Sequence, residues 1–328
     1  MKLLQRPHRD FEEKSIEING VLYRFGGPAP RPPDPPSEED IMSGWEWPDD
    51  SPLVSVLVHA YNHVGFIEDC LNGILMQKTS FPFEVIVRDD ASNDATASII
   101  KAYAERYPAI INPILESTNK FTLGVRPMKA TSAHARGKYI ALCEADDYWL
   151  DANNLAKKVA LLQSNSEISL VGSDAIVISK DGIISEFPRG RINKGKTGST
   201  FSLRRGQLFA HTNAMVFRKL PFDDMPSLSL TFNGDNIIHV LAGQYGSALH
   251  IELECLSAYR LHAGGVWSSG SNRKLSDSAL GFRKWVLRYH LKNGNRLSAS
   301  IAVFDLAWFS MKRYVKKGLS FAHGRREY

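Results

Sequence analysis

Three acidic side chains, Glu144, Asp146 and Asp147, directly follow the apolar run 138–143. Carboxylates at the end of a buried strand are unfavourable unless a cation pairs with them. Mg²⁺ and Mn²⁺ prefer oxygen ligands and are commonly held by one or two carboxylates together with substrate phosphates. A solvated acidic turn is the alternative, and the aromatic pair at 148–149 makes it the weaker one. The segment therefore predicts a metal or phosphate site.

A second polar segment, residues 89–96, follows the apolar run 83–88 and begins with Asp89 and Asp90. A carboxylate at a strand end can accept a hydrogen bond from the imide N–H of uracil or thymine. Asp, Ser and Asn are also favoured turn and helix-cap residues. Taken alone, this segment indicates a base-binding role and a purely structural role about equally.

Two later segments also contain groups that could do chemistry. Asp235 lies at the start of an expected helix, where it could cap the helix or act as a general base. Arg260 and His262 lie two residues apart after an expected strand and before a Gly pair, and they could close over a diphosphate. The Gly pair alone indicates only a loop.

The elements that must position these residues alternate along the chain. The apolar patterns predict strands at 53–59, 83–88, 110–115, 138–143, 168–179, 211–219 and 248–259, and helices at 64–76, 94–106, 126–136, 151–164 and 233–242. Such alternation predicts an α/β fold with a mostly parallel sheet covered by helices on both faces. Ligands of such sheets bind outside the carboxyl ends of the strands, where the two acidic segments lie.

Residues 1–50 are expected to be an extension that precedes the main domain. Residues 16–25 contain Asn19-Gly20 between short apolar runs, which predicts a small hairpin. Residues 28–36 contain six prolines, which indicates an extended linker. Trp45 and Trp47 are expected to dock this arm onto the main domain.

The net positive charge of the chain comes from the C-terminal region, residues 271–328. The whole chain has a net charge of +5, and residues 277–328 hold 11 Lys and Arg against 3 acids. Two amphipathic helices are expected at 276–291 and 296–317. Solvated charge around a packed helical lid is one interpretation, and docking on an anionic membrane through residues such as Trp308 and Phe309 is the other. The segment has no recognisable nucleic-acid-binding motif, so we expect no nucleic-acid partner.

Cysteine usage and hydropathy indicate a cytoplasmic protein. Cys70, Cys143 and Cys255 are far apart in apolar stretches, which predicts small buried side chains and not a disulfide or metal site. We see no signal-peptide pattern and no apolar run of about 18 residues that would predict a transmembrane helix.

Six segments, in this order, resemble glycosyltransferase family 2. Residues 54–62 are similar to its opening strand and "YN" turn, 89–96 to its "DDxSxDxT" segment, and 137–149 to the "GxYIxxxEGDDYW" form of its DXD motif. Residues 211–219, 234–235 and 259–268 complete the order, so the resemblance covers about residues 51–270. It departs from the family at Glu144, which replaces the first Asp of the DXD motif, and at Ala145, which replaces the usual Gly.

The resemblance implies a role for each matching residue, within a GT-A, Rossmann-like domain at 51–270. The nucleotide sugar would be bound by Ala60, Tyr61, Asn62, Asp89, Asp90, Arg126, Asp146, Arg260 and His262, with Asp90 on the base. The metal, Mn²⁺ or Mg²⁺, would be held by Glu144, Asp146, Asp147 and His262. Asp235 would be the catalytic base.

The function implied is that of a metal-dependent inverting glycosyltransferase. It would move a sugar from a UDP-sugar donor to a glycan or lipid-linked acceptor in cell-surface polysaccharide synthesis, either free in the cytoplasm or peripherally at the inner membrane face. A non-catalytic sugar-nucleotide-binding or scaffold protein is the rival from another class. A nucleotidyltransferase would need a Gly-rich basic loop after the first strand, and residues 60–65 do not form one.

Overall fold

The computed structural model describes residues 15–18, 20–46, 51–186, 198–207, 210–231, 234–251, 256–263 and 272–323. Its strands are β1 (Ser15–Ile18), β2 (Val21–Arg24), β3 (Val54–Ala60), β4 (Phe83–Asp89), β5 (Ile111–Leu115), β6 (Tyr139–Leu142), β7 (Tyr148–Trp149), β8 (Ile168–Ser173), β9 (Ala175–Ser179), β10 (Ile184–Glu186), β11 (Met215–Arg218), β12 (Ser247–Ile251) and β13 (Ser257–Leu261). Its α-helices are α1 (Glu38–Ser43), α2 (Ile67–Leu75), α3 (Thr96–Arg106), α4 (Pro127–Ser132), α5 (Asn154–Ser164), α6 (Thr200–Arg204), α7 (Gly234–Ala242), α8 (Asn272–Lys292) and α9 (Arg296–His323).

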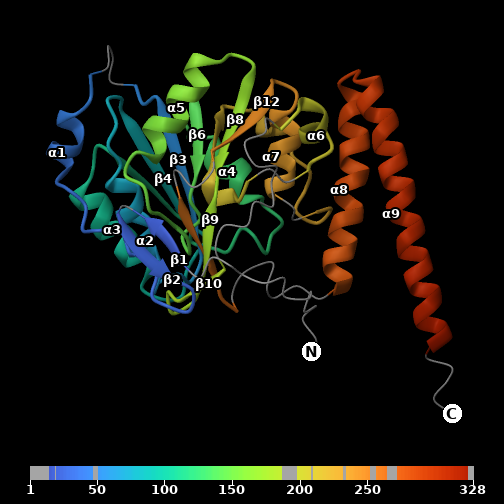
Figure 1. Ribbon diagram of the computed structural model, residues 1–328, viewed down its shortest axis with the longest axis horizontal. Coiled ribbons are helices and arrows are strands. Elements are labelled where there is room, and N and C mark those ends of the chain that lie inside the picture. Colours follow the sequence, from blue (N-terminus) through green and yellow to red (C-terminus); the bar gives the residue numbers. More distant parts are fainter. Residues whose placement is uncertain are drawn as a thin grey trace.

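The main sheet has seven strands in the order β12-β8-β11-β6-β3-β4-β5. Figure 1 labels five of them, β12, β8, β6, β3 and β4. The pairs β3–β4, β3–β6, β4–β5 and β8–β12 are parallel, whereas β11 runs antiparallel between β6 and β8. The predicted mostly parallel sheet is therefore confirmed. Because β3, β4 and β6 run in the same direction, the segments that follow them lie along one edge of the sheet.

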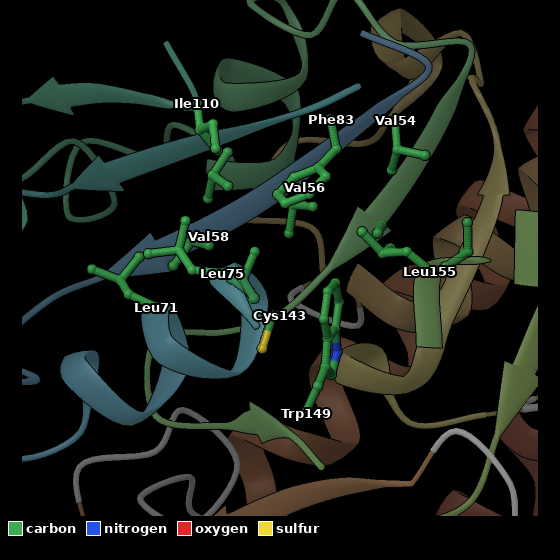
Figure 2. Packing of buried hydrophobic residues seen from close by; sticks show 14 of the residues in the cluster. Val54, Val56, Val58, Leu71, Leu75, Phe83, Ile110, Cys143, Trp149 and Leu155 are labelled. Carbon is green, nitrogen blue, oxygen red and sulfur yellow. The ribbon is translucent and has the colours of Figure 1, made fainter. Parts of the chain in front are cut away.

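Strand β3 contributes to the hydrophobic cores on both faces of this sheet, because successive side chains of a strand point to opposite faces. Val54, Val56 and Val58 pack with residues of α2, α3 and α5, as Figure 2 shows for Leu71, Leu75 and Leu155. Leu57 belongs to the core on the other face, with residues of α4, α6, α7 and α8. Helices thus cover the sheet on both faces, as the sequence predicts.

A smaller four-stranded sheet, β10-β9-β13-β7, lies beside the first. In it β13 pairs antiparallel with β7, with Ala258 opposite Tyr148. This pairing places the residues that follow β13 next to the acidic loop that precedes β7. Trp149 is fully buried beside Cys143 (Figure 2), and its indole N–H donates to the carbonyl of Asn213 at 2.7 Å. The buried indole therefore fixes the far end of the acidic loop.

The N-terminal segment packs against the main domain. The predicted hairpin is confirmed as β1 and β2, which pair antiparallel. The hydroxyl of Tyr148 donates to the carbonyl of Pro30 at 2.9 Å, and that of Tyr107 donates to the carbonyl of Pro36 at 2.9 Å. The ring of Trp45 packs edge-on against Phe83, with centroids 5.7 Å apart, which confirms its predicted docking role, whereas Trp47 lies outside the described residues. The proline-rich segment is extended, as expected, but it contacts the domain along its length.

The two expected C-terminal helices are present as α8 and α9, and α9 extends to His323. They form an antiparallel pair beside α6 and α7 (Figure 1). In the described part of the chain, no helix is both long enough and apolar enough to cross a membrane.

Three expected elements differ in the structure. The single strand expected at 168–179 is two strands, β8 and β9, which separate at Asp174 and join different sheets. The strand expected at 248–259 is likewise divided into β12 and β13. The helix expected at 126–136 ends at Ser132. In the segments 168–179 and 248–259, one apolar run contributes strands to two sheets. The periodicity of the sequence alone does not show where the chain passes from one sheet to the other.

The predicted nature of the cysteines is confirmed where the structure describes them. Cys70 and Cys143 are both free and fully buried. Cys255 lies outside the described residues.

Candidate active site

The acidic loop between β6 and β7 presents Asp146 toward two histidines. Oδ2 of Asp146 lies 2.8 Å from Nε2 of His262, which follows β13. The side chains of Asp146, His262 and His63 converge, with one possible ligand atom of each within 4.8 Å of the other two. A carboxylate and two imidazoles converging in this way form a donor set suited to a divalent metal ion. The structure therefore brings together two of the predicted ligands, Asp146 and His262.

His63 belongs to this cluster although the sequence analysis did not identify it. It lies between β3 and α2, and its ring packs edge-on against His262 with centroids 5.7 Å apart. Burial lowers its pKa, which favours the neutral imidazole that binds metals. The available signal was its position directly after the "YN" turn, at the carboxyl end of β3. Nothing in the sequence showed that β13 would bring His262 to the same place.

The protonation of Asp146 also suits a ligand. Burial alone would raise its pKa, but the hydrogen bond with His262 and the charges of His63 and His262 outweigh burial, so that the pKa lies below its ordinary value. The carboxyl is thus ionised at neutral pH and available to a cation.

Asp147 points elsewhere. Its carboxyl is almost fully buried, and Oδ1 accepts a hydrogen bond of 2.8 Å from the backbone N–H of Arg260. Burial, together with the adjacent charge of Asp146, raises its pKa. The structure does not bring Asp147 into the cluster of His63, Asp146 and His262, in contrast to the predicted ligand set.

Glu144 is also outside that cluster. Its carboxylate faces β3, where Oε2 lies 3.1 Å from Nδ1 of His59, and its side chain is one-third exposed. The two predicted metal ligands Glu144 and Asp147 thus contact different partners, because residues 144–147 form a turn that the N–H of Asp147 closes on the carbonyl of Glu144 at 2.9 Å.

Arg260 lies beneath the acidic loop. Its guanidinium donates to the carbonyl of Asp146 at 2.9 Å and to the carboxylate of Asp69 at 3.0 Å. It stacks on the ring of Phe66, 4.7 Å from the centroid, and is only 6% exposed. In this arrangement Arg260 supports the loop and does not face the surface where a diphosphate would bind.

The other half of the edge is formed by the residues after β3 and β4. Asn62 has a left-handed backbone, with φ of 56°, and its side-chain oxygen accepts a hydrogen bond from the N–H of Asn93. The N–H of Asn62 in turn donates to the hydroxyl of Ser92 at 2.9 Å. These two bonds join the turns into one surface, next to Ala60, which is buried, and Tyr61, whose side chain is exposed.

Asp89 and Asp90 are both buried in this surface and hydrogen-bonded within the protein. Asp89 accepts from the N–H and hydroxyl of Ser92. Asp90 accepts from the N–H groups of Lys120 and Phe121 at 3.0 and 2.9 Å, and from Arg88. A carboxylate has about four acceptor positions, so Asp90 retains capacity for a further donor.

Arg126 precedes α4 and Asp235 lies in α7, two helices that contribute to the same hydrophobic core. The Arg126 side chain donates to the carbonyls of Pro226 and Thr231, and burial lowers its pKa to about 10. It thereby holds the segment that leads into α7. Asp235 is in the first turn of α7, where burial raises its pKa and the charge of Glu144 adds to the effect.

Tyr259 connects the two sides of the site electrostatically. Burial and the charges of Asp147, Asp146 and Asp235 raise its pKa to about 12. These three carboxylates therefore act on one phenol, which places Asp235 in the electrostatic neighbourhood of the acidic loop.

Comparison with known proteins identifies relatives of this arrangement. The family model described as Glycosyl transferase family 2 matches residues 55–224. An uncharacterized protein of Mycobacterium tuberculosis is 38% identical over 219 residues, which are 66% of this chain and 61% of that protein. The chain thus matches about three fifths of the length of this relative.

Two solved structures share the fold. S. aureus TarS in complex with UDP-GlcNAc has a TM-score of 0.55 and 16% identity, over 71% of this chain and 66% of that one. The mannosyltransferase PcManGT of Pyrobaculum calidifontis, in complex with GDP-Man and Mn²⁺, has a TM-score of 0.50 and 18% identity, over 87% and 86%. The fold is therefore GT-A-like, which confirms the expected class.

Proposed function

Because the chain belongs to glycosyl transferase family 2, we propose that it transfers a sugar from UDP to an acceptor hydroxyl, with inversion at the anomeric carbon. The observation that carries this proposal is the convergence of Asp146, His262 and His63 at the carboxyl edge of the sheet. A structural acidic turn would not require two imidazoles that approach the same carboxylate. The raised pKa of Asp235 nearby adds a group suited to accept a proton.

Asp146, His262 and His63 would hold the metal ion, Mn²⁺ or Mg²⁺. The mixture of one carboxylate and two imidazoles fits such an ion, and leaves room for the oxygens of a diphosphate. When bound, the ion would offset the negative charge that the departing nucleoside diphosphate gains. Arg260 would act as a positioning residue, because it holds the carbonyl of Asp146 from beneath the loop.

The surface formed by Tyr61, Asn62 and Asp90 would bind the nucleotide. Two features support uridine there. The remaining acceptor capacity of Asp90 suits an imide N–H, and the exposed ring of Tyr61 offers a face on which a base can stack. The hydrogen bonds between Asn62 and the turn at 92–93 fix this surface before a ligand binds.

Asp235 would be the general base. The acceptor oxygen attacks the anomeric carbon while its proton passes to the Asp235 carboxylate, and the bond from that carbon to the diphosphate oxygen breaks. Burial raises the pKa of Asp235 toward working pH, which strengthens it as a base. A single displacement of this kind inverts the configuration at the anomeric carbon.

The acceptor would be a glycan linked to a lipid, met at the inner face of a membrane. Helix α9 supports this assignment, because one of its faces exposes a row of apolar side chains. We call this row the apolar stripe of α9, and it consists of Leu297, Phe304, Trp308, Met311 and Val315. Lys312 lies over the ring of Trp308, 4.8 Å from its centroid. Apolar and cationic side chains in this arrangement suit the interface of an anionic bilayer.

Calorimetric titration of the full chain with UDP, with and without Mn²⁺, tests the nucleotide and metal assignments. We expect binding of UDP that requires Mn²⁺, and weaker binding of GDP and TDP. Asp146→Asn should abolish the dependence on Mn²⁺, whereas Asp223→Asn, at a side chain that is 98% exposed and pairs with Lys129, should not. Equal UDP affinity with and without the metal would overturn the metal assignment. An assay of sugar transfer from the UDP-sugar then distinguishes an enzyme from a non-catalytic binding protein.

A further inference from the structure

A pocket of about 480 Å³ lies between the C-terminal helix pair and the segment that joins α6 to α7. It is separate from the cluster of Asp146, His262 and His63. Four basic side chains and one acidic side chain line it, and we call it the basic pocket; the five are Arg204, Arg205, Arg283, Lys312 and Asp305. Three aromatic rings, those of Phe282, Trp308 and Phe309, complete its walls.

The charge of the pocket is only partly compensated within the protein. Arg205 forms a bidentate pair with Asp305, at 2.9 and 2.7 Å. Arg204 and Arg283 donate to backbone carbonyls, and in the part of the chain that the structure describes neither they nor Lys312 form an ion pair with a carboxylate. The pocket therefore retains excess positive charge and can accept an anion.

Arg283 is the side chain most clearly prepared for such an anion. Its guanidinium stacks on the ring of Phe309, 4.0 Å from the centroid, and one nitrogen donates to the carbonyl of Ala279. A guanidinium held flat against a ring has a fixed fork of N–H donors, which matches the geometry of a phosphate. Burial lowers the pKa of Arg283, and the charge of Asp305 only partly opposes this effect.

The pocket and the proposed base share the first turn of α7. Asn236 lines the pocket, donates to the carbonyl of Gly206 at 2.7 Å, and directly follows Asp235 in the first turn of α7. A ligand in the pocket would therefore contact the first turn of α7, the turn that also contains the proposed base. On the other side, Trp308 belongs both to the pocket wall and to the exposed apolar stripe of α9.

We propose that the basic pocket binds the phosphate of a lipid-linked acceptor, a proposal that rests on the proposed function. The phosphate lies against Arg283 and Lys312, the sugar beyond it extends past Asn236 toward Asp235, and the apolar chain leaves past Trp308. The combination of excess cations, aromatic walls and continuity with the apolar stripe of α9 fits an anionic group attached to an apolar chain better than a free sugar.

Calorimetric titration of the full chain with geranyl phosphate, in the absence of donor and metal, tests this proposal. Inorganic phosphate and geraniol are the comparison ligands. We expect geranyl phosphate to bind and both comparison ligands to bind at least tenfold more weakly. Inorganic phosphate that binds equally well would overturn the lipid assignment, geraniol that binds equally well would overturn the phosphate assignment, and no binding of any of the three would overturn the site.

Three variants locate the binding. Arg283→Gln and Lys312→Gln should each weaken geranyl phosphate binding about tenfold or more, whereas Lys284→Gln, at an exposed position of α8 outside the pocket, should leave it unchanged. Lys312 is itself exposed, so its variant tests the site even if Arg283→Gln does not fold. Unchanged affinity in both pocket variants would overturn the assignment.

The same variants should bind UDP and Mn²⁺ like the parent protein, which shows that they are folded. Failure of UDP binding in the parent protein, with geranyl phosphate binding intact, would remove the proposed function and leave the pocket. UDP binding in the parent protein without geranyl phosphate binding would overturn the pocket assignment and leave the proposed function.

Discussion

Nη2 of Arg260 donates a hydrogen bond of 3.0 Å to Oδ2 of Asp69, and this buried ion pair links α2 to the strand that ends beside the acidic loop. The other carboxylate oxygen of Asp69 accepts from Arg31 at 2.9 and 2.6 Å. One carboxylate thus joins the proline-rich segment, α2 and β13. Arg260 is buried, whereas the side chain of Arg31 is 71% exposed, so the two cations should differ in their effect on stability.

We expect Arg260→Gln to lower the free energy of unfolding by about 3–5 kcal/mol, because it leaves Asp69 and the carbonyl of Asp146 with a lost partner in the interior. Arg31→Gln should lower it by about 1 kcal/mol or less, since an exposed ion pair contributes little. Urea denaturation monitored by circular dichroism measures both. Equal losses in the two variants would contradict the distinction.

The proposed base gives a prediction about catalysis. Asp235→Asn should lower the rate of sugar transfer about a hundredfold or more, because the amide cannot accept the acceptor proton. Its affinity for UDP and Mn²⁺ should stay that of the parent protein. The double variant Asp235→Asn, Asn236→Asp moves the carboxylate by one residue and tests whether its position matters. We expect this double variant to transfer sugar as slowly as Asp235→Asn alone. Transfer by Asp235→Asn at a rate near that of the parent would remove Asp235 from the role.

Residues in and near the acidic loop should differ in their effect on metal binding. His63→Ala and Asp146→Asn should each weaken Mn²⁺ binding about tenfold or more, since each removes a member of the cluster. Glu144→Gln should change it less, because that carboxylate faces His59. Electron paramagnetic resonance of free Mn²⁺ measures the affinities. A larger loss in Glu144→Gln than in His63→Ala would contradict the geometry and favour the set predicted from the sequence.

The sequence was sufficient to predict the mostly parallel sheet and two members, Asp146 and His262, of the cluster proposed to hold the metal. Apolar runs that alternate with helical patterns predict a mostly parallel sheet covered by helices, and a carboxylate after one of its parallel strands lies at the edge where ligands bind. It was not sufficient for His63 or for the orientation of Asp147. Both depend on the pairing of β13 with β7, a contact between residues more than 100 positions apart. Local patterns contain no information about such a pairing, nor about the places where the chain passes from one sheet to the other.

Gly137 makes a close contact that its motif alone would not explain. A Cβ at this position would lie 2.5 Å from the backbone nitrogen of Ser55. We expect Gly137→Ala to lower the free energy of unfolding by about 1–3 kcal/mol, because β3 must shift to accept the methyl group. Gly65→Ala is the matched control, since a Cβ there meets no atom within 4 Å. Thermal denaturation measures both variants, and equal stability of the two would contradict the contact.

His239 gives the chain a pH dependence of known sign. It is fully buried in α7, its Nδ1–H donates to the carbonyl of Asp235 at 2.7 Å, and burial lowers its pKa to about 4 from the ordinary 6.5. Between these two values the unfolded chain binds a proton at this side chain and the folded chain does not. The free energy of unfolding therefore rises with pH from 4 to 6.5 and is fully gained above 6.5. As the pH falls through this window, the loss should reach about 3 kcal/mol.

Urea denaturation of the parent protein and of His239→Gln, at several pH values from 4 to 8, tests this expectation. The variant is expected to be less stable at pH 8, because glutamine does not reproduce the ring packing. Its stability should nevertheless fall less steeply below pH 6.5, since the group that binds a proton only on unfolding is gone. His134→Gln, at an exposed side chain, is the control and should keep the slope of the parent protein. The same slope in the parent and in His239→Gln would show that other groups cause the acid sensitivity.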